Sequence, residues 1–220
     1  MKRNMIFTGI SAVLFVALIV MLKTYDVAAI GPQGTEIGFA ALNGSVRDAI
    51  GMNMFWYDLT ELLGMMALSV CGVFGLMGLV QMLRRRSLLK VDHQILALGV
   101  FYVAVVACYV LFELVIINYR PVILPGDALV EASFPSSHTM LSCCAMGSTA
   151  MVLKRYIKGD VLCKGLQAGC VVLGAVVVIG RLLSGVHWLT DIIGGVLLSC
   201  ILLGVLAMAL ELLGWVLEKD

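Results

Sequence analysis

Charge is scarce in this chain of 220 residues. Only 13% of its residues are Asp, Glu, Lys or Arg, whereas 61% are hydrophobic, and the formal net charge is +1. A soluble domain of this length needs more charged residues to cover its surface. The composition therefore predicts an integral membrane protein, and the near-zero net charge gives no reason to expect a nucleic acid as a partner.

The sequence also lacks the cysteine spacing of a metal site or of a disulfide framework. None of its seven cysteines forms a Cys-x-x-Cys pair, and no cluster of histidine and cysteine occurs. Six of them lie within apolar runs and Cys163 lies in a basic segment, which we expect to be a loop. We predict that they behave as small hydrophobic residues, and we predict neither a metal ion nor a cofactor.

Long apolar runs predict a single domain, residues 1–220, that forms an all-α bundle of six transmembrane helices. The predicted spans are residues 5–22, 62–83, 95–117, 139–153, 166–180 and 192–215. The first run could also be a signal peptide, but it is longer than a usual signal core, which favours a retained helix. The aromatic segment 55–57 is expected to anchor the chain just before the second span.

A shorter helix is predicted between the first two spans. Its apolar positions Phe39, Leu42, Val46 and Ile50 recur at helical spacing. Its polar positions, such as Asn43, fall on the opposite face. This pattern predicts an amphipathic helix that lies on the outer membrane surface, or else an ordinary surface helix packed over the bundle.

The basic residues predict the orientation of the bundle. Eleven of the fifteen Lys and Arg residues fall on one side of the predicted spans: Lys2, Arg3, Arg84, Arg85, Arg86, Lys90, Lys154, Arg155, Lys158, Lys164 and Lys219. The side that is rich in basic residues is expected to be cytoplasmic. Six spans then place both termini in the cytoplasm and the remaining basic residues, including Arg120 and Arg181, at the extracytoplasmic face.

Polar residues gather between the last two apolar runs, where Arg181, His187 and Asp191 occur within a few positions of one another. Four residues separate His187 from Asp191, so on a helix they share one face. A carboxylate there can accept the Nδ1 proton of the imidazole and leave Nε2 free as a nucleophile or base. Arg181 can bind phosphate oxygens. The simpler alternative is an interfacial loop whose polar residues reach toward water.

Two further polar segments border other apolar runs: Asn118-Tyr119-Arg120-Pro121 and Phe134-Pro135-Ser136-Ser137-His138. In order and spacing, the three segments resemble the motifs of the type-2 phosphatidic acid phosphatase superfamily, which are Lys-x6-Arg-Pro, Pro-Ser-Gly-His and Ser-Arg-x5-His-x3-Asp. Three positions depart from the pattern: Glu113 replaces the Lys, Ser137 the Gly and Gly180 the Ser. Three motifs in order are a specific signal, whereas one alone would be weak.

The resemblance implies a role for each matching residue. His187 would attack phosphorus and form a phosphohistidine, Asp191 would orient His187, and His138 would protonate the leaving alcohol. Arg120 and Arg181 would hold the phosphoryl group. Two more phosphate-binding groups are expected near a helix N-terminus, with Pro135 in the first helical turn: Ser136 and Ser137.

Glu113 needs a different role from the lysine that it replaces, because a carboxylate beside a phosphate dianion is repulsive. Seven residues separate it from Arg120, so on a helix the two share a face. We expect Glu113 to orient Arg120 or Arg181 by pairing with it. Contact with a cationic substrate group and a loss of activity are alternatives.

The sequence thus predicts a membrane phosphatase for a lipid phosphate, such as phosphatidic acid, phosphatidylglycerophosphate or a polyprenyl diphosphate. A lipid phosphotransferase that uses the same site, and a catalytically weakened homologue that binds lipid, are the alternatives. A transporter is a weaker reading, because no charged pair falls at mid-membrane depth.

Overall fold

The structure, a computed structural model, describes residues 1–124 and 128–217, and it describes side chains as far as Gly214. Lys219, one of the basic residues counted above, and the side chain of Trp215, at which the sixth predicted span ends, lie outside the described residues. The helices are α1 (Lys2–Thr24), α2 (Ala40–Ile50), α3 (Met54–Arg85), α4 (His93–Leu114), α5 (Ser137–Tyr156), α6 (Asp160–Leu183) and α7 (Leu189–Leu217), with short 3-10 turns η1 (Pro32–Gly34) and η2 (Leu88–Lys90).

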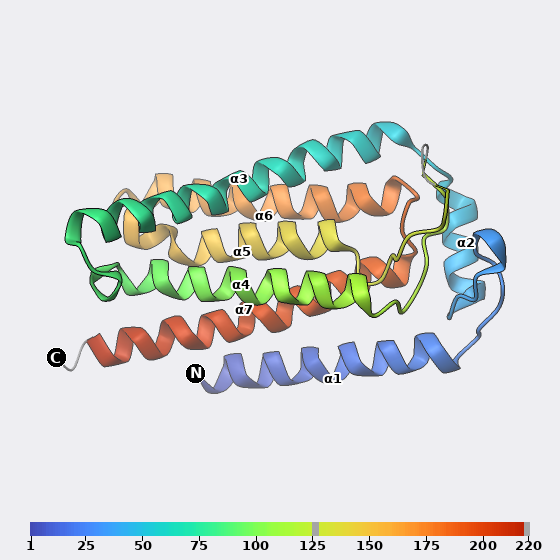
Figure 1. The fold of residues 1–220 in the computed structure, drawn as a ribbon, viewed down its shortest axis with the longest axis horizontal. Helices are drawn as coiled ribbons and strands as arrows, with labels where there is room; N and C mark the ends of the chain where they lie inside the picture. The colour runs from blue at the N-terminus through green and yellow to red at the C-terminus, as the bar shows by residue number, and fades with distance from the viewer. Residues whose placement is uncertain (125–127, 218–220) are drawn as a thin grey trace.

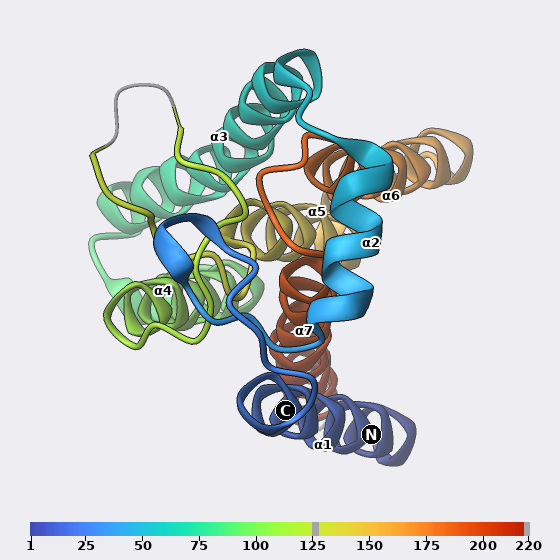
Figure 2. The same cartoon turned by 90° about the vertical axis from the view of Figure 1, so that its right-hand side faces the viewer.

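The long helices run side by side, while α2 crosses one end of the bundle (Figures 1 and 2). Five of them are long and apolar enough to cross a membrane: α1, α3, α4, α6 and α7. The predicted span 139–153 corresponds to α5, which does not meet the same criterion. Its many buried residues include Thr139, Ser142 and Ser148, because α3, α4, α6 and α7 all contact it. A helix enclosed by other helices can carry small polar residues that a lipid-facing helix cannot.

Helix α3 begins eight residues before the predicted span. Its N-cap is Asn53, whose side chain accepts a hydrogen bond from the backbone N–H of Trp56 at 3.3 Å. A helix of 32 residues is about 48 Å long, which exceeds the roughly 30 Å hydrocarbon thickness of a bilayer. The aromatic segment therefore lies within the helix rather than before it, and the first turns of α3 add Tyr57, Thr60 and Glu61 to the end of the bundle.

Helix α2 occupies the segment in which a short helix was predicted, but one residue of its predicted polar face, Asn43, points inward. Asn43 is fully buried and donates hydrogen bonds to the carbonyl of Gly38 at 2.8 Å and to Oγ1 of Thr190 at 3.0 Å. Leu42, on the predicted apolar face, is 45% exposed. The buried amide explains this orientation, because a polar group that is paired inside the protein holds the helix against the start of α7.

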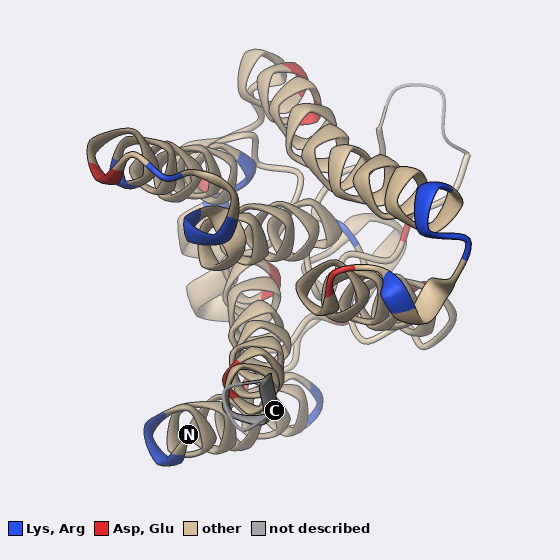
Figure 3. Cartoon of the chain, turned by 90° about the vertical axis from the view of Figure 1, so that its left-hand side faces the viewer, with Lys and Arg blue, Asp and Glu red and all other residues tan. Residues whose placement is uncertain are grey.

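The two ends of the bundle differ in charge. Helix α1 begins and helix α7 ends at the same end (Figure 1), where the described basic residues of the α3–η2 and α5–α6 connections also lie (Figure 3). At this end Asp92 accepts hydrogen bonds from Gln81 at 2.9 Å and from Arg85 at 3.1 Å, which ties α3 to α4. Cys163, which was expected in a loop, is a buried residue of α6. The opposite end holds the three motif segments.

Candidate functional site

The three motif segments are joined by hydrogen bonds around the start of α7. The indole N–H of Trp188 donates to the carbonyl of Tyr119 at 2.7 Å, and the side chain of Asn118 donates to Oδ1 of Asp191 at 3.4 Å. The backbone N–H of Ser136 donates to the carbonyl of Asp191 at 3.0 Å. One buried turn thus holds two segments of the α4–α5 loop, which places residues from all three motifs together.

Asp191 belongs to the first turn of α7, and His187 lies just before this helix. Oδ2 of Asp191 accepts a hydrogen bond from the backbone N–H of Trp188 at 3.0 Å, as an acidic residue in a first helical turn commonly does. The same oxygen lies 3.7 Å from Nδ1 of His187, and both side chains are almost completely buried. Nε2 is therefore the ring nitrogen that faces away from the carboxylate.

The surroundings of His187 favour its neutral form. Burial lowers the pKa of His187 well below its usual value, and the nearby positive charges of Arg181 and Arg120 lower it further. A neutral imidazole has a free lone pair, which a nucleophile requires.

Arg181 lies at the end of α6 and is completely buried. Its Nη1 donates to Oε1 of Glu61 at 3.0 Å and to Oγ1 of Thr60 at 3.4 Å. The ring of Tyr57 lies against the guanidinium, with 5.0 Å between the centroid of the ring and Cζ of Arg181. These three residues occupy positions i, i+3 and i+4 of α3, so one face of its first turns covers the arginine.

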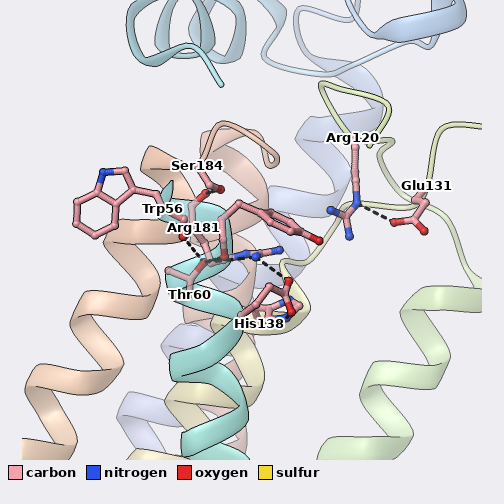
Figure 4. A network of polar contacts seen from close by, with 9 residues as sticks. Trp56, Thr60, Arg120, Glu131, His138, Arg181 and Ser184 are labelled. Carbon is pink, nitrogen blue, oxygen red and sulfur yellow. Dashed lines mark hydrogen bonds and ion pairs between the residues drawn. The ribbon is translucent and has the colours of Figure 1, made fainter. Parts of the chain in front are cut away.

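Arg120 is held by the loop between α4 and α5. The backbone N–H of Arg120 donates to the carbonyl of Glu131 at 3.0 Å, and Nε of Arg120 lies 3.1 Å from the Glu131 carboxylate. Its side chain is 12% exposed. Figure 4 shows Arg120 and Glu131 on one side of the group formed by Arg181, Thr60 and His138.

Glu61 is a site residue that was not predicted from the sequence. Its Oε2 lies 3.0 Å from Nε2 of His138, and its other oxygen binds Arg181. The one signal in the sequence was a carboxylate at the edge of the second apolar run, on the side predicted to hold the site. The predicted span began after Glu61 and none of the three motifs includes it, so nothing in the motif pattern pointed to this residue.

Buried polar atoms without a hydrogen-bond partner among the described residues are concentrated at this site. The two arginines contribute Nη1 of Arg120 and both Nε and Nη2 of Arg181. The imidazoles contribute Nδ1 of His138 and Nε2 of His187. Buried nitrogens of this kind normally have partners, and most of these are donors, so the arrangement fits an oxyanion as the missing partner.

The serine motif precedes α5 in a different conformation from the one predicted. Pro135 follows a cis peptide bond and lies before the helix, rather than in its first turn. Ser136 is the N-cap residue, and its buried Oγ has no partner within the described part of the chain. Ser137, which stands in place of the family's Gly, is the first residue of α5 and is half-buried.

The predicted pairing of Glu113 with an arginine is wrong. The described carboxylates that pair with Arg120 and Arg181 are those of Glu131 and Glu61. Glu113 is exposed near the end of α4, where it helps to line a narrow polar cavity of about 20 Å³ that Arg120 and His187 also line. The prediction failed because the α4–α5 loop turns Arg120 away from the helical register that it would share with Glu113.

The departure at Gly180 has a packing explanation. A Cβ atom at this position would lie 2.5 Å from Cγ2 of Thr60 and 3.0 Å from the ring of Trp56. Helix α3 therefore approaches α6 closely where the family has a serine.

Within the described residues, no group of three His, Cys, Asp or Glu side chains lies close enough to hold a metal ion.

Comparisons with known proteins agree with the motifs. No curated protein matches the sequence. A crystal structure of a transmembrane PAP2-type phosphatidylglycerolphosphate phosphatase from Bacillus subtilis is similar in fold, with a TM-score of 0.66 and 19% identity over 93% of this chain and 96% of that one. This similarity and the apolar helices support a multi-pass membrane protein. A sequence model of the PAP2 superfamily matches residues 58–213, so the chain belongs to this superfamily, the one that its three motifs resemble.

Proposed function

We propose that this protein is a membrane phosphatase that hydrolyses a phosphomonoester or diphosphate of a lipid through a phosphohistidine at His187. The observation that carries the proposal is the group of buried arginine and histidine nitrogens that have no hydrogen-bond partner among the described residues. They lie at one end of a bundle whose long helices expose many large apolar side chains along their length, where a lipid head group would meet them. Burial strengthens the attraction of both guanidiniums for a phosphate dianion.

In the first step, Nε2 of His187 attacks phosphorus while Arg120 and Arg181 neutralise the charge on the phosphoryl oxygens. The bond between phosphorus and the lipid oxygen breaks as the bond between nitrogen and phosphorus forms. His138 gives a proton to the departing oxygen, so the lipid leaves as an alcohol, or as a monophosphate if the substrate is a diphosphate. Asp191 orients the imidazole and stabilises its positive charge.

In the second step, water attacks phosphorus and the bond to His187 breaks. His138, now neutral, accepts a proton from the water, which restores the starting protonation states. Inorganic phosphate then leaves. Neither step requires a group beyond the side chains already named.

Phosphate release from purified protein in detergent tests the proposal. The substrates are phosphatidic acid, phosphatidylglycerophosphate and a polyprenyl diphosphate, and His187→Ala is the control. We expect wild-type protein to release phosphate from at least one of them and His187→Ala to release none while remaining folded. Phosphoryl transfer to an alcohol without free phosphate would identify a phosphotransferase, whereas binding without turnover would identify a catalytically weakened homologue.

A further inference from the structure

A carboxylate of α3 connects the two groups that are proposed to act on opposite sides of the reacting bond. Glu61 contacts Arg181, which would hold the phosphoryl group, and His138, which would protonate the leaving oxygen; both distances are 3.0 Å. Its partners are 120 and 77 residues away in the chain. The Glu61 side chain is 32% exposed, whereas that of Arg181 is completely buried.

The geometry at Arg181 leaves one edge of the guanidinium for phosphate. Glu61 and Thr60 accept from Nη1. Nε and Nη2, which together form the side-on fork that binds two oxygens of one anion, are buried and have no partner within the described residues. Glu61 therefore fixes the arginine from its outer edge and does not compete for the donors that would bind phosphate.

At His138, as at Arg181, Glu61 holds one nitrogen and leaves another without a partner among the described residues. An ionised carboxylate can only accept hydrogen bonds, so Nε2 of His138 must be the donor to Glu61. The two ring nitrogens point in different directions, so Nδ1 remains available for the leaving oxygen. Nδ1 is buried and also has no partner in the described part of the chain.

We propose that Glu61 is the positioning residue for the general acid: it holds Nε2 of His138 and Nη1 of Arg181, so that His138 gives its proton to the leaving oxygen from Nδ1. This role rests on the proposed function. As the bond between phosphorus and the lipid oxygen breaks, the proton on Nδ1 moves to that oxygen and the imidazole becomes neutral. The Glu61 carboxylate takes no part in this transfer and stabilises the imidazolium before it. The other charged groups around His138 are Arg181 of α6 and Arg120 of the α4–α5 loop, and the neutral, titratable imidazole of His187 in the α6–α7 turn also lies nearby.

Two esters with different leaving groups test this role. The leaving group of a lipid phosphomonoester is an alkoxide, which needs a proton. The leaving group of p-nitrophenyl phosphate is a stable aryl oxide, which does not. We expect Glu61→Gln to lower kcat about 100-fold for the lipid ester. For the aryl ester, where only the weaker hold on Arg181 matters because Thr60 and Tyr57 still contact this arginine, the loss should be less than about fivefold. Glu61→Asp, which keeps the charge, should recover part of the lipid rate.

Two matched variants serve as controls. Asp58→Asn removes an exposed carboxylate of the same helix and should leave both rates unchanged. Glu131→Gln removes the partner of Arg120 and should impair both esters by a similar factor. Equal losses on the two esters in folded Glu61→Gln, or no loss on either, would overturn the role of Glu61 alone. A wild-type protein that hydrolyses neither ester would overturn the proposed function together with it.

Discussion

At the scale of single residues, Asp191 serves both the fold and the proposed chemistry. Its carboxylate accepts from the backbone of Trp188 and from Asn118 and also lies beside Nδ1 of His187. Asp191→Asn keeps the size of the side chain but removes the charge that stabilises an imidazolium. We expect kcat for phosphate release to fall by about 10³-fold or more, by analogy with buried aspartates of other catalytic triads. A folded variant with kcat within tenfold of wild type would contradict this role.

A second prediction concerns Glu113. This carboxylate holds neither Arg120 nor Arg181, so Glu113→Gln should leave kcat within about twofold of the wild-type value. It should lower KM, because a negative charge that lines the cavity near Arg120 and His187 repels a phosphate dianion. Steady-state kinetics with one lipid phosphate measure both quantities. A tenfold loss of kcat would instead support the pairing of Glu113 with an arginine that the sequence predicted.

Motif spacing predicted most of the residues that the structure brings together at the candidate site, but it could not identify Glu61. The His187–Asp191 contact is local, so a spacing of four residues was enough to predict it. The contacts of Glu61 join α3 to α5 and α6, and their positions depend on how α3 packs against both helices. The same reasoning explains the error at Glu113, because helical register does not extend into the loop that carries Arg120.

At the scale of helices, the contact between α3 and α6 gives a third prediction. Gly180→Ser would restore the family's residue but place Cβ 2.5 Å from Cγ2 of Thr60. Overpacking of this kind costs about 1–3 kcal/mol, so the midpoint of thermal unfolding should fall by about 2–4 °C per kcal/mol. The control is Gly165→Ser in the same helix, where nothing lies within 4 Å. Equal stability of the two variants would show that α3 can move away without cost.

Hydropathy predicted every long helix, but it did not predict which helices and which helix faces the rest of the protein buries. It placed α5 among the spans, and the structure shows a helix enclosed by its neighbours and rich in buried Ser and Thr. It also assigned Asn43 to an outward polar face, whereas this residue is bound to Thr190 inside the protein. A helical periodicity gives two faces but does not say which of them the rest of the chain will cover.

At the scale of the whole molecule, the unequal charge of the two ends predicts how the bundle lies in a membrane. Eleven of the fifteen basic residues are predicted from the sequence to lie on the side opposite the site, and ten of these eleven are among the residues that the structure describes. The positive-inside rule predicts that this side is cytoplasmic. We therefore expect the site to face outward.

Cysteine labelling in intact cells tests this orientation. The seven native cysteines, all free in the structure, would first be replaced. A new cysteine at Ser45, exposed on α2, should then react with an impermeant maleimide in intact cells, whereas one at Gly159, exposed between α5 and α6, should react only after lysis. The reverse labelling would place the site in the cytoplasm and require a lipid phosphate of the inner leaflet as substrate.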